Sequence, residues 1–483
     1  MNPSRSIADE LAAVDLGDRR LNRRAARVLV RLCESPLASP KAAMHGGAEV
    51  AAAYRLFDHE ECTEQAILKP HHAAVLERVR QYPRVLVIQD TSELDYTRHS
   101  ELEGKGPLAS EDRQGFFLHT QWVVTDQRLP LGSWRCQIYA REVEQIGVVS
   151  AQRKRTPIEE KESYRWLEGY RSACALAEQA PAVHVISCSD REGDVYEVFA
   201  EWHQRRERLQ PAADCLIRCH HNRGVLGFED RPLVPRVDAR LLEQVAQNPV
   251  LGAIRFEVST KTQFKKVKGH RQRTVRQGRT VRLEVRAGQV VLRPPPRREH
   301  RLPEVTLGVV RATEIDPPTG QEPIDWVILT SLPVRNFDDA LSVVELYRGR
   351  WEIEVLHRVL KSGCRIENLQ FESDTRLKPA LAMYLIVAWR ILYLLKLGRQ
   401  SPQLPGDALF EESEWKPLCV VVRGGPPPPH PPSLGEVILM IAQFGGYLGR
   451  KSDGPPGPEA LWRGLQSLKC FSLAWRSFGP NTS

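Results

Sequence analysis

Three acidic residues, far apart in the chain, have the neighbours that phosphodiester chemistry requires. The apolar run RVLVIQ leads directly into Asp90, and the run VHVISC leads into Asp190, so two predicted buried strands each deliver a carboxylate. Glu354 lies in the helical pattern ELYRGRWEIEVLHRVLK. Two divalent cations held by carboxylates can clamp the attacking and leaving oxygens of a displacement at phosphorus. We therefore predict that these three acids hold two Mg²⁺ ions, with Mn²⁺ able to substitute and Asp90 bridging both.

A single aspartate at the end of a strand is more often a turn or cap residue than a metal ligand. Asp95 also competes with Asp90, because both lie close to the same apolar run. Only Asp90 directly ends that run, which makes it the stronger candidate. The prediction depends on the three acids acting together.

Glu354 lies on a predicted helix that we place over residues 337–361, and the same helix also carries cations. At about 100° per residue, one stripe of this helix carries the acid together with groups that can contact phosphates. An exposed helix with ion pairs one turn apart would give the same pattern. We favour contact with DNA for the members of the stripe other than Glu354, which are Tyr347, Arg350, Arg358 and Lys361.

A second cationic stripe lies near the N-terminus, opposite apolar residues that recur at helical spacing. Such a stripe is either a solvated face or a surface for DNA phosphates. We expect phosphate contact because the arginines have no acids beside them on the stripe. They are Arg20, Arg23, Arg24, Arg27 and Arg31.

The elements around the acids alternate between strands and helices. After the strand before Asp90, we predict strands at 116–124 and 131–141, a helix at 162–180, the strand before Asp190, a helix at 194–206 and strands at 215–219 and 326–330. A second apolar helix is predicted at 376–398. This order indicates an α/β fold with a mixed sheet flanked by helices.

Residues 235–325 depart from this order, with short alternating segments that predict an inserted β-rich subdomain. Between Lys261 and Arg286 this region has ten Lys or Arg against one acid, Glu284, which indicates a basic ribbon. The tract GGPPPPHPP at 424–432 predicts a semi-rigid linker before a last helical segment.

The composition is that of a folded, basic protein of several domains. The chain has 483 residues, 68 Lys plus Arg against 60 Asp plus Glu and a net charge of +8, which favours a polyanionic partner. Its ten scattered cysteines predict reduced thiols and a cytoplasmic location. The group Cys215, Cys219, His220 and His221 has no second ligand pair at zinc spacing, so buried thiols are expected there. The longest apolar stretch is broken by Arg390, so no membrane role is predicted.

The motifs together resemble one family, the cut-and-paste transposases of bacterial insertion sequences, which have DDE chemistry and a ribonuclease H-like core. The branch signature is Tyr, two residues, Arg, three residues, Glu, six residues, Lys, and this chain matches it without a gap from Tyr347 to Lys361. Further resemblance lies in QDTSELDY around Asp90, SCSDREGDVYE around Asp190, the strand WVILTSLPV and the segment FGGYLG. The proline tract at 424–432 departs from the family pattern.

The resemblance implies an endonuclease and strand transferase acting on double-stranded DNA. Water would nick the end of the element, the freed 3′ hydroxyl would form a hairpin on the other strand, and the reopened hairpin would insert into target DNA. Trp326 resembles the family tryptophan that stacks on a flipped base, although its apolar strand WVILT also fits a core position. A homodimer on two inverted-repeat ends is implied, in the cytoplasm of a bacterium and associated with the nucleoid.

Other residues match positions near the family's active site with less specificity. They are Arg191, Asp194 and Arg218, and an arginine beside acids is often only charge compensation. His119 is either an outer-shell group or an ordinary strand histidine, and we favour the second.

The predicted domains are a helical DNA-binding domain at 1–75, a ribonuclease H-like catalytic domain at 76–375 and a helical dimerisation domain at 376–483. Two alternatives are a domesticated DNA-binding protein without catalysis and a ribonuclease H-like nuclease without transposition. Loss of an acid would favour the first, and absence of the terminal domains would favour the second; the sequence shows neither.

Overall fold

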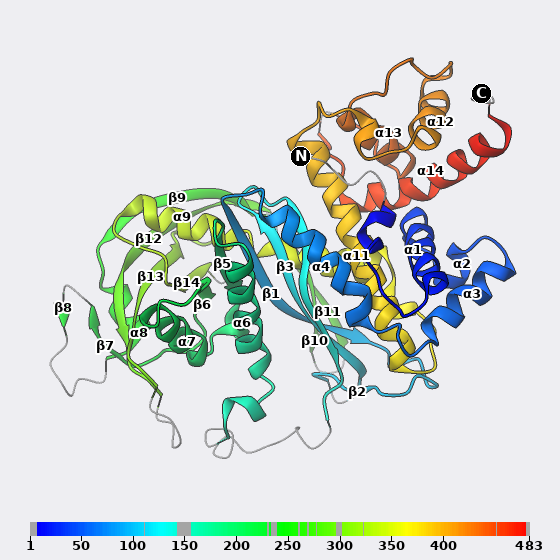
Figure 1. Cartoon of the computed structure of the whole chain (residues 1–483). Helices are drawn as coiled ribbons and strands as arrows, with labels where there is room; N and C mark the ends of the chain where they lie inside the picture. Colours follow the sequence, from blue (N-terminus) through cyan, green and yellow to red (C-terminus); the bar gives the residue numbers. More distant parts are fainter. Residues whose placement is uncertain are drawn as a thin grey trace. The chain divides into compact units, whose positions relative to one another are not determined.

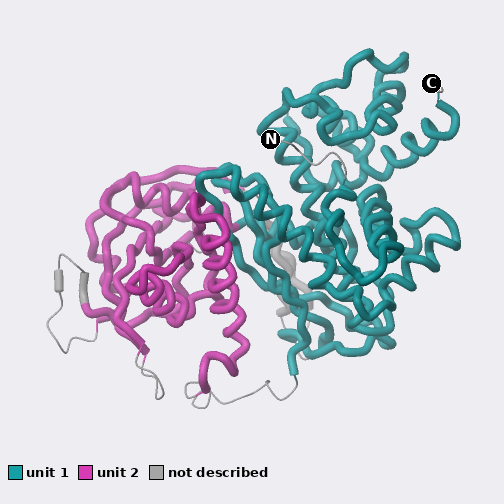
Figure 2. The backbone as a smooth tube through the Cα atoms, viewed as in Figure 1, with its two compact units in different colours: residues 1–148, 351–483 teal, residues 149–350 magenta. Residues whose placement is uncertain are grey.

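The computed structural model describes residues 7–110, 112–142, 156–228, 231–232, 239–258, 261–267, 270–276, 278–295, 302–321, 323–450 and 452–479. The chain forms two compact units, which Figure 2 shows in separate colours. Unit 1 combines residues 1–148 with 351–483, and unit 2 comprises residues 149–350.

Unit 1 begins with helices, as the sequence predicts. They are the 3₁₀ helix η1 (Ile7–Leu11), α1 (Arg19–Glu34), α2 (Pro40–Ala43), α3 (Gly47–Phe57) and α4 (Glu64–Val79). Asp18 caps the start of α1 by accepting a hydrogen bond from the Arg20 N–H. The helix buries Leu21, Val28 and Leu32, which confirms the predicted amphipathic pattern.

Four strands of unit 1 pair antiparallel around β3. They are β1 (Arg84–Asp95), β2 (Gly106–Pro107), β3 (Gln114–Thr125) and β4 (Pro130–Tyr139). The prediction that the first strand ends at Asp90 is wrong, because β1 continues to Asp95 in register with β3. The continuous burial of β1 does stop at Asp90, which is half-buried and lies opposite Thr120.

The C-terminal part of unit 1 is helical. Its elements are α10 (Trp351–Arg358), the π-helical turn η5 (Val359–Gly363), η6 (Ile366–Asn368), α11 (Asp374–Gln400), η7 (Gly406–Ala408), α12 (Glu412–Arg423), α13 (Leu434–Phe444) and α14 (Pro458–Phe478). The proline tract connects α12 to α13 without helix or strand, as predicted. Figure 1 shows α11 running beside α4, and it also contacts β4.

Helix α11 is long and apolar enough to cross a membrane by length and composition alone, with a mean hydropathy of 1.7. In this protein 94% of that window is buried, so α11 is a core helix of unit 1. Trp389 anchors it by donating a hydrogen bond from Nε1 to the Pro130 carbonyl at 3.1 Å.

Unit 2 is a mixed sheet with helices. Its elements are η3 (Ile158–Glu160), α6 (Tyr164–Gln179), β5 (His184–Ser189), η4 (Arg191–Gly193), α7 (Tyr196–Glu207), β6 (Asp214–Arg218), β7 (Val225–Phe228), β8 (Arg231–Pro232), α8 (Leu241–Ala246), β9 (Val250–Val258), β10 (Lys261–Val267), β11 (His270–Arg276), β12 (Arg279–Leu292), β13 (Val305–Glu314), β14 (Asp325–Thr330) and α9 (Phe337–Arg348). Among the strand pairings described within unit 2, that of β5 with β6 is parallel and the others are antiparallel.

The β-rich region predicted at 235–325 contains β9 to β13. Strands β12 and β13 extend the sheet that contains β6 and β14, in the order β5-β6-β14-β13-β12. The basic segment forms a separate hairpin in which β10 pairs with β11. The predicted ribbon is therefore confirmed in its backbone, and most of its side chains lie outside the described residues.

The single helix predicted over residues 337–361 is wrong. Helix α9 ends at Arg348, α10 begins at Trp351, and the chain turns π-helical from Val359. The side chains of the predicted stripe therefore do not follow one uniform helical period, because the axis is interrupted at Gly349 and a π turn advances by fewer degrees per residue.

Candidate functional site

Two of the three predicted acids belong to unit 1, on elements that contact each other. Asp90 lies in β1, and Glu354 lies in α10, which packs on β1. Both acids are half-buried. The Oδ1 atom of Asp90 accepts a hydrogen bond from the Thr91 N–H at 2.8 Å, which fixes the orientation of the carboxylate.

Helix α10 is held in place by an acid beside Glu354. Glu352 is buried, and its Oε1 accepts a hydrogen bond from Lys396 Nζ of α11 at 2.7 Å. Because Glu352 and Glu354 share one short helix, this ion pair also fixes the position of Glu354. The sequence pattern does not indicate this pairing, since Lys396 is distant in the chain.

The two cations that follow Glu354 differ in their surroundings. Arg358 is exposed and makes no ion pair with another residue of the described ranges. Lys361 lies in the π turn, and its Nζ is 3.7 Å from Glu367 Oε1. That carboxylate also accepts the Asp95 N–H at 2.9 Å, so the end of β1 and the π turn share one acid.

The competing acid Asp95 is engaged in a turn. Burial raises its pKa, but hydrogen bonds from Thr97 and the charge of Arg113 outweigh burial and lower it. The Oδ1 atom of Asp95 accepts both the N–H of Thr97 at 3.0 Å and its hydroxyl at 2.6 Å. Asp95 therefore has the structural role that a strand-terminal aspartate commonly has.

The third acid, Asp190, lies in unit 2 directly after β5, as the sequence predicts. It is also the N-cap of η4, because its Oδ1 accepts the Glu192 N–H at 2.9 Å. Among the residues described, no group of three or more His, Cys, Asp or Glu has the arrangement of a metal site.

Tyr347 joins several predicted residues of unit 2. It is buried, and burial raises the pKa of its hydroxyl above the usual value. The positive charges of Arg350 and Arg218 oppose this shift, and the negative charge of Asp190 adds to it. These electrostatic effects place Tyr347 within range of two guanidinium groups and the carboxylate.

Arg218 is partly buried beneath this group. Burial is the largest cause of its lowered pKa, and the charges of Arg191 and Arg350 lower it further. Its Nη2 donates to the Asp325 carbonyl at 3.2 Å, next to Trp326, while its buried Nε has no partner within the described residues. A buried guanidinium with an unsatisfied N–H donor favours an anionic ligand.

Trp326 is half-buried at the start of β14, so it is not a core residue. Its ring stacks on Phe256 and meets Tyr347 edge to face, with centroids 5.9 Å apart. Trp326 therefore joins the aromatic and cationic residues of unit 2.

Asp194 and His119 have structural partners. Asp194 is 3% exposed, and its carboxylate accepts the N–H groups of His220 and His221 at 2.7 and 2.8 Å and an N–H of Arg223 at 2.6 Å. It therefore fixes the segment that follows β6. His119 is fully buried in β3 and contacts the Thr91 hydroxyl through Nδ1 at 2.9 Å, beside Asp90.

The cysteines of the sequence CLIRC are buried free thiols, as predicted. Burial raises the pKa of Cys215 and Cys219, which disfavours the thiolate that zinc binding requires.

The N-terminal stripe is only partly available to a ligand. Arg31 forms ion pairs with Glu34 at 3.1 Å and with Glu49 at 3.2 Å, so the expectation that all five arginines lack acidic partners is wrong for this one. The remaining four have no ion pair with another described residue, and all but the half-buried Arg24 are exposed: Arg20, Arg23, Arg24 and Arg27.

Sequence reasoning missed Trp351, which is 50% exposed on the first turn of α10, near Glu354. The signal in the sequence is an aromatic residue outside the apolar side of the helix that carries the acid.

Three protein families match separate parts of the chain. The transposase DNA-binding family matches residues 4–62, the transposase DDE domain matches residues 197–390, and the transposase Tn5 dimerisation domain matches residues 386–478. The first match contains the N-terminal arginines. The second contains Trp326, the whole Tyr347 to Lys361 signature and Glu354, and it begins after Asp90 and Asp190.

An α/β fold of the ribonuclease H-like class, with a DDE domain between DNA-binding and dimerisation domains, defines a nuclease and strand transferase acting on DNA. The chain belongs to the DDE transposases of the Tn5 type. It is a DNA transposase that binds DNA and forms a dimer, and DDE domains generally use divalent metal ions.

Proposed function

We propose that this transposase moves its element by a cut-and-paste route in which Asp90, Asp190 and Glu354 together hold two Mg²⁺ ions. The observation that carries the proposal is the complete signature from Tyr347 to Lys361 within the DDE match, with its Glu354 on α10, the helix that packs against the strand of Asp90. Carboxylate oxygens fit Mg²⁺, a hard cation that prefers oxygen ligands. When bound, the ions supply charge stabilisation to the attacking and leaving oxygens.

The other side chains of the proposed site bind and orient DNA. Arg358 and Lys361 hold backbone phosphates near the cut, and Arg350 and Arg218 do so beside Tyr347, whose hydroxyl donates to the terminal phosphate. Trp326 stacks on a base that leaves the helix. The exposed arginines of α1 bind the backbone of the inverted repeat.

The reaction sequence that we propose has four steps. Water hydrolyses one strand at the end of the element, and the freed 3′ hydroxyl attacks the opposite strand to close a hairpin. Hydrolysis reopens the hairpin, and the 3′ hydroxyl then attacks target DNA. A dimer on two ends performs these steps in the bacterial cytoplasm, associated with the nucleoid, with Mn²⁺ able to replace Mg²⁺.

The test is a cleavage assay of the purified protein on a duplex that contains one element end and its flanking DNA. We expect cleavage with Mg²⁺ and none with Ca²⁺. Asp90→Asn, Asp190→Asn and Glu354→Gln each abolish cleavage while binding of the end stays measurable. Near wild-type cutting by any of the three removes that residue from the site.

Asp95→Asn is the matched control, because it removes a carboxylate from the same strand as Asp90. We expect this variant to cleave DNA, since Asp95 serves the turn at Thr97. Loss of cleavage in this control as well would mean that neutralising either acid merely disrupts β1. Products of strand transfer into a second plasmid distinguish the transposase from a nuclease that only cuts.

A further inference from the structure

Unit 1 contains a cavity of about 390 Å³ that none of the predicted catalytic acids lines. Helices α1, α11, α12 and α14 supply its walls, so residues from the DNA-binding and dimerisation regions meet there. Its charged lining is predominantly cationic. The cations are Arg27, Arg31, Arg390, Lys469 and Arg476, and the acids are Glu34, Glu411 and Glu414.

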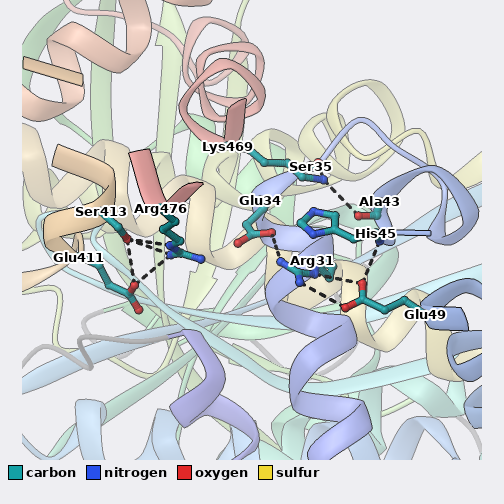
Figure 3. Close-up of polar contacts among 10 residues, drawn as sticks. All are labelled: Arg31, Glu34, Ser35, Ala43, His45, Glu49, Glu411, Ser413, Lys469 and Arg476. Atoms are coloured by element: carbon teal, nitrogen blue, oxygen red, sulfur yellow. Dashed lines mark hydrogen bonds and ion pairs between the residues drawn. The ribbon is translucent and has the colours of Figure 1, made fainter. Parts of the chain in front are cut away.

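Two of the five cations are neutralised by carboxylates. Arg31 pairs with Glu34 and with Glu49, and Arg476 pairs with Glu411 at 3.1 Å, as the dashed lines in Figure 3 show. Arg27, Arg390 and Lys469 form no ion pair with any residue of the described ranges. The cavity therefore has a surplus of positive charge.

Glu414, the acid that remains, interacts electrostatically with Arg390 but forms no ion pair with it among the described residues. It is strongly buried, and burial raises the pKa of its carboxyl above the usual value. One of its oxygens accepts the Glu411 N–H at 2.8 Å in the capping box of α12. Part of the acceptor capacity of Glu414 therefore serves the helix end.

Arg390 is one of the cavity's cations that no carboxylate of the described residues pairs with. Its guanidinium lines the cavity from the buried helix α11, and within the described residues it makes one hydrogen bond, from Nη2 to the Leu409 carbonyl at 2.9 Å. Burial is the main reason that its pKa is lowered. A guanidinium has five N–H donors, so this one hydrogen bond uses only a small part of its donor capacity.

Lys469 is the second cation that lacks a carboxylate. It reaches from α14 to the N-terminal helices, donating to Ser35 Oγ at 2.9 Å and to the Ala43 carbonyl at 3.1 Å (Figure 3). Both acceptors are neutral, and burial lowers the pKa of its ammonium group. The charge of Lys469 is therefore not balanced by the groups to which it donates.

We propose that this cavity binds a phosphoryl group, which Arg390 and Lys469 hold. A guanidinium can donate two parallel hydrogen bonds to phosphate oxygens, and an ammonium group adds a point charge. The volume lies at the small end of the range of about 300–1,000 Å³ for ligand sites, which suits a free phosphate, a mononucleotide or one phosphate of a DNA backbone. The anion would relieve the surplus charge at the meeting point of the DNA-binding and dimerisation regions.

The first experiment measures the thermal midpoint of the full-length protein in inorganic phosphate, against chloride at equal ionic strength. We expect a saturable rise in wild type, because a ligand that binds only the folded state stabilises it. Arg390→Gln abolishes the rise. Arg399→Gln preserves it, since Arg399 is another arginine of α11 that donates to a backbone carbonyl, that of Pro456, and does not line the cavity.

The absence of a saturable rise in wild type overturns the proposal, and so does its equal loss in Arg399→Gln. Hydrogen exchange of the wild-type protein keeps the test independent of whether Arg390→Gln folds. Phosphate must slow exchange in α12 and in the middle of α14 around Lys469 more than around Arg399. Uniform slowing contradicts a site at Arg390.

A competition experiment distinguishes the two sources of the phosphoryl group. If the cavity takes a backbone phosphate, inorganic phosphate weakens binding of a duplex containing the element end more than chloride does, and Arg390→Gln removes the difference. If it takes a free anion, phosphate and chloride have equal effects on DNA binding while the thermal rise persists. Either result supports a phosphoryl site, because both require the saturable rise.

Discussion

Trp326 stacks on Phe256, with ring centroids 5.7 Å apart and ring planes inclined by 21°. The Arg348 guanidinium lies over the same Phe256 ring, 4.6 Å from its centroid. The indole is therefore supported by an aromatic ring of strand β9. A supported ring that is only half-buried is a preformed surface for a base.

Trp326→Ala is expected to allow the first nick and to reduce hairpin formation about ten-fold or more. The reason is that stacking of an unpaired base on an aromatic ring contributes about 1–3 kcal/mol. Denaturing gels of end-labelled DNA separate the nicked strand from the hairpin in a single reaction. An unchanged ratio of hairpin to nick would show that Trp326 does not act on the flipped base.

Phe256→Ala tests the support beneath the tryptophan. Aromatic pairs contribute about 0.5–1.5 kcal/mol beyond their buried area, so hairpin yield should fall by a few-fold, less than for Trp326→Ala. Phe256→Tyr keeps the ring and should retain the yield. If Phe256→Ala cuts and forms hairpins like wild type, the stack is not part of the platform.

Replacing Arg20 and Arg23 together by Ala should weaken binding of the element end and make it less salt dependent. Each lost phosphate contact reduces the slope of log affinity against log salt by about 0.9. Both side chains are exposed and lie outside the cavity. Affinities measured over a range of salt concentrations give the slope, and an unaltered slope would make this face merely solvated.

Arg31→Ala is the contrasting substitution on the same helix. Because Arg31 is paired with Glu34 and Glu49, its loss should lower the thermal midpoint and leave the salt slope almost unchanged. A reduced slope in Arg31→Ala would mean that these ion pairs exchange for DNA phosphates on binding.

The sequence patterns predicted which helices and strands exist better than they predicted the residues at which these elements begin and end. Val85 to Ile88 are apolar and buried, as the pattern indicates, but β1 continues beyond Asp90 because β3 supplies backbone partners up to Asp95. Pairing between strands depends on a partner elsewhere in the chain, which local periodicity does not encode.

The same reason explains the errors in the candidate site. The residue types of the signature were recognisable, yet the break at Gly349 and the π turn at Val359 depend on packing around the helix. Likewise, the ion pair of Arg31 with Glu49 joins α1 to α3, so the residue spacing within α1 could not predict it. Sequence identified what the side chains can do, and tertiary contacts decided which of them are available.

The ion pair between Glu352 and Lys396 should be needed to hold α10. Lys396→Met leaves a buried carboxylate without its cation, which should destabilise unit 1 by about 3 kcal/mol and slow cleavage. The double variant Glu352→Leu with Lys396→Leu should recover stability, since no charge is then left buried. Thermal unfolding and cleavage rates of the three proteins provide the check, and equal stability of Lys396→Met and wild type would contradict it.

A buried polar network joins η1 to α4 and β4. Glu10 accepts hydrogen bonds from His71 Nδ1 at 2.6 Å and from Arg78 Nη1 at 2.5 Å, and His71 Nε2 accepts the Ser133 N–H at 3.2 Å. An Nε2 that accepts a hydrogen bond has no proton, so the imidazole is neutral. This agrees with the lowered pKa of His71, for which burial is the largest cause.

Because of this network, the free energy of unfolding of the protein should depend on pH. Burial alone would raise the pKa of Glu10, but His71 and Arg78 outweigh it and lower the pKa to about 2. A carboxyl whose pKa is lower in the folded state than in the unfolded state stabilises the fold at every pH above its unfolded pKa of 4.5. This stabilisation, about 3 kcal/mol, is lost as the pH falls from 4.5 toward 2. Glu10→Gln should therefore unfold at a lower temperature than wild type at pH 7. The difference between the two unfolding temperatures should become smaller below pH 4.5. A difference that stays constant down to pH 3 would show that the Glu10 charge does not stabilise the fold.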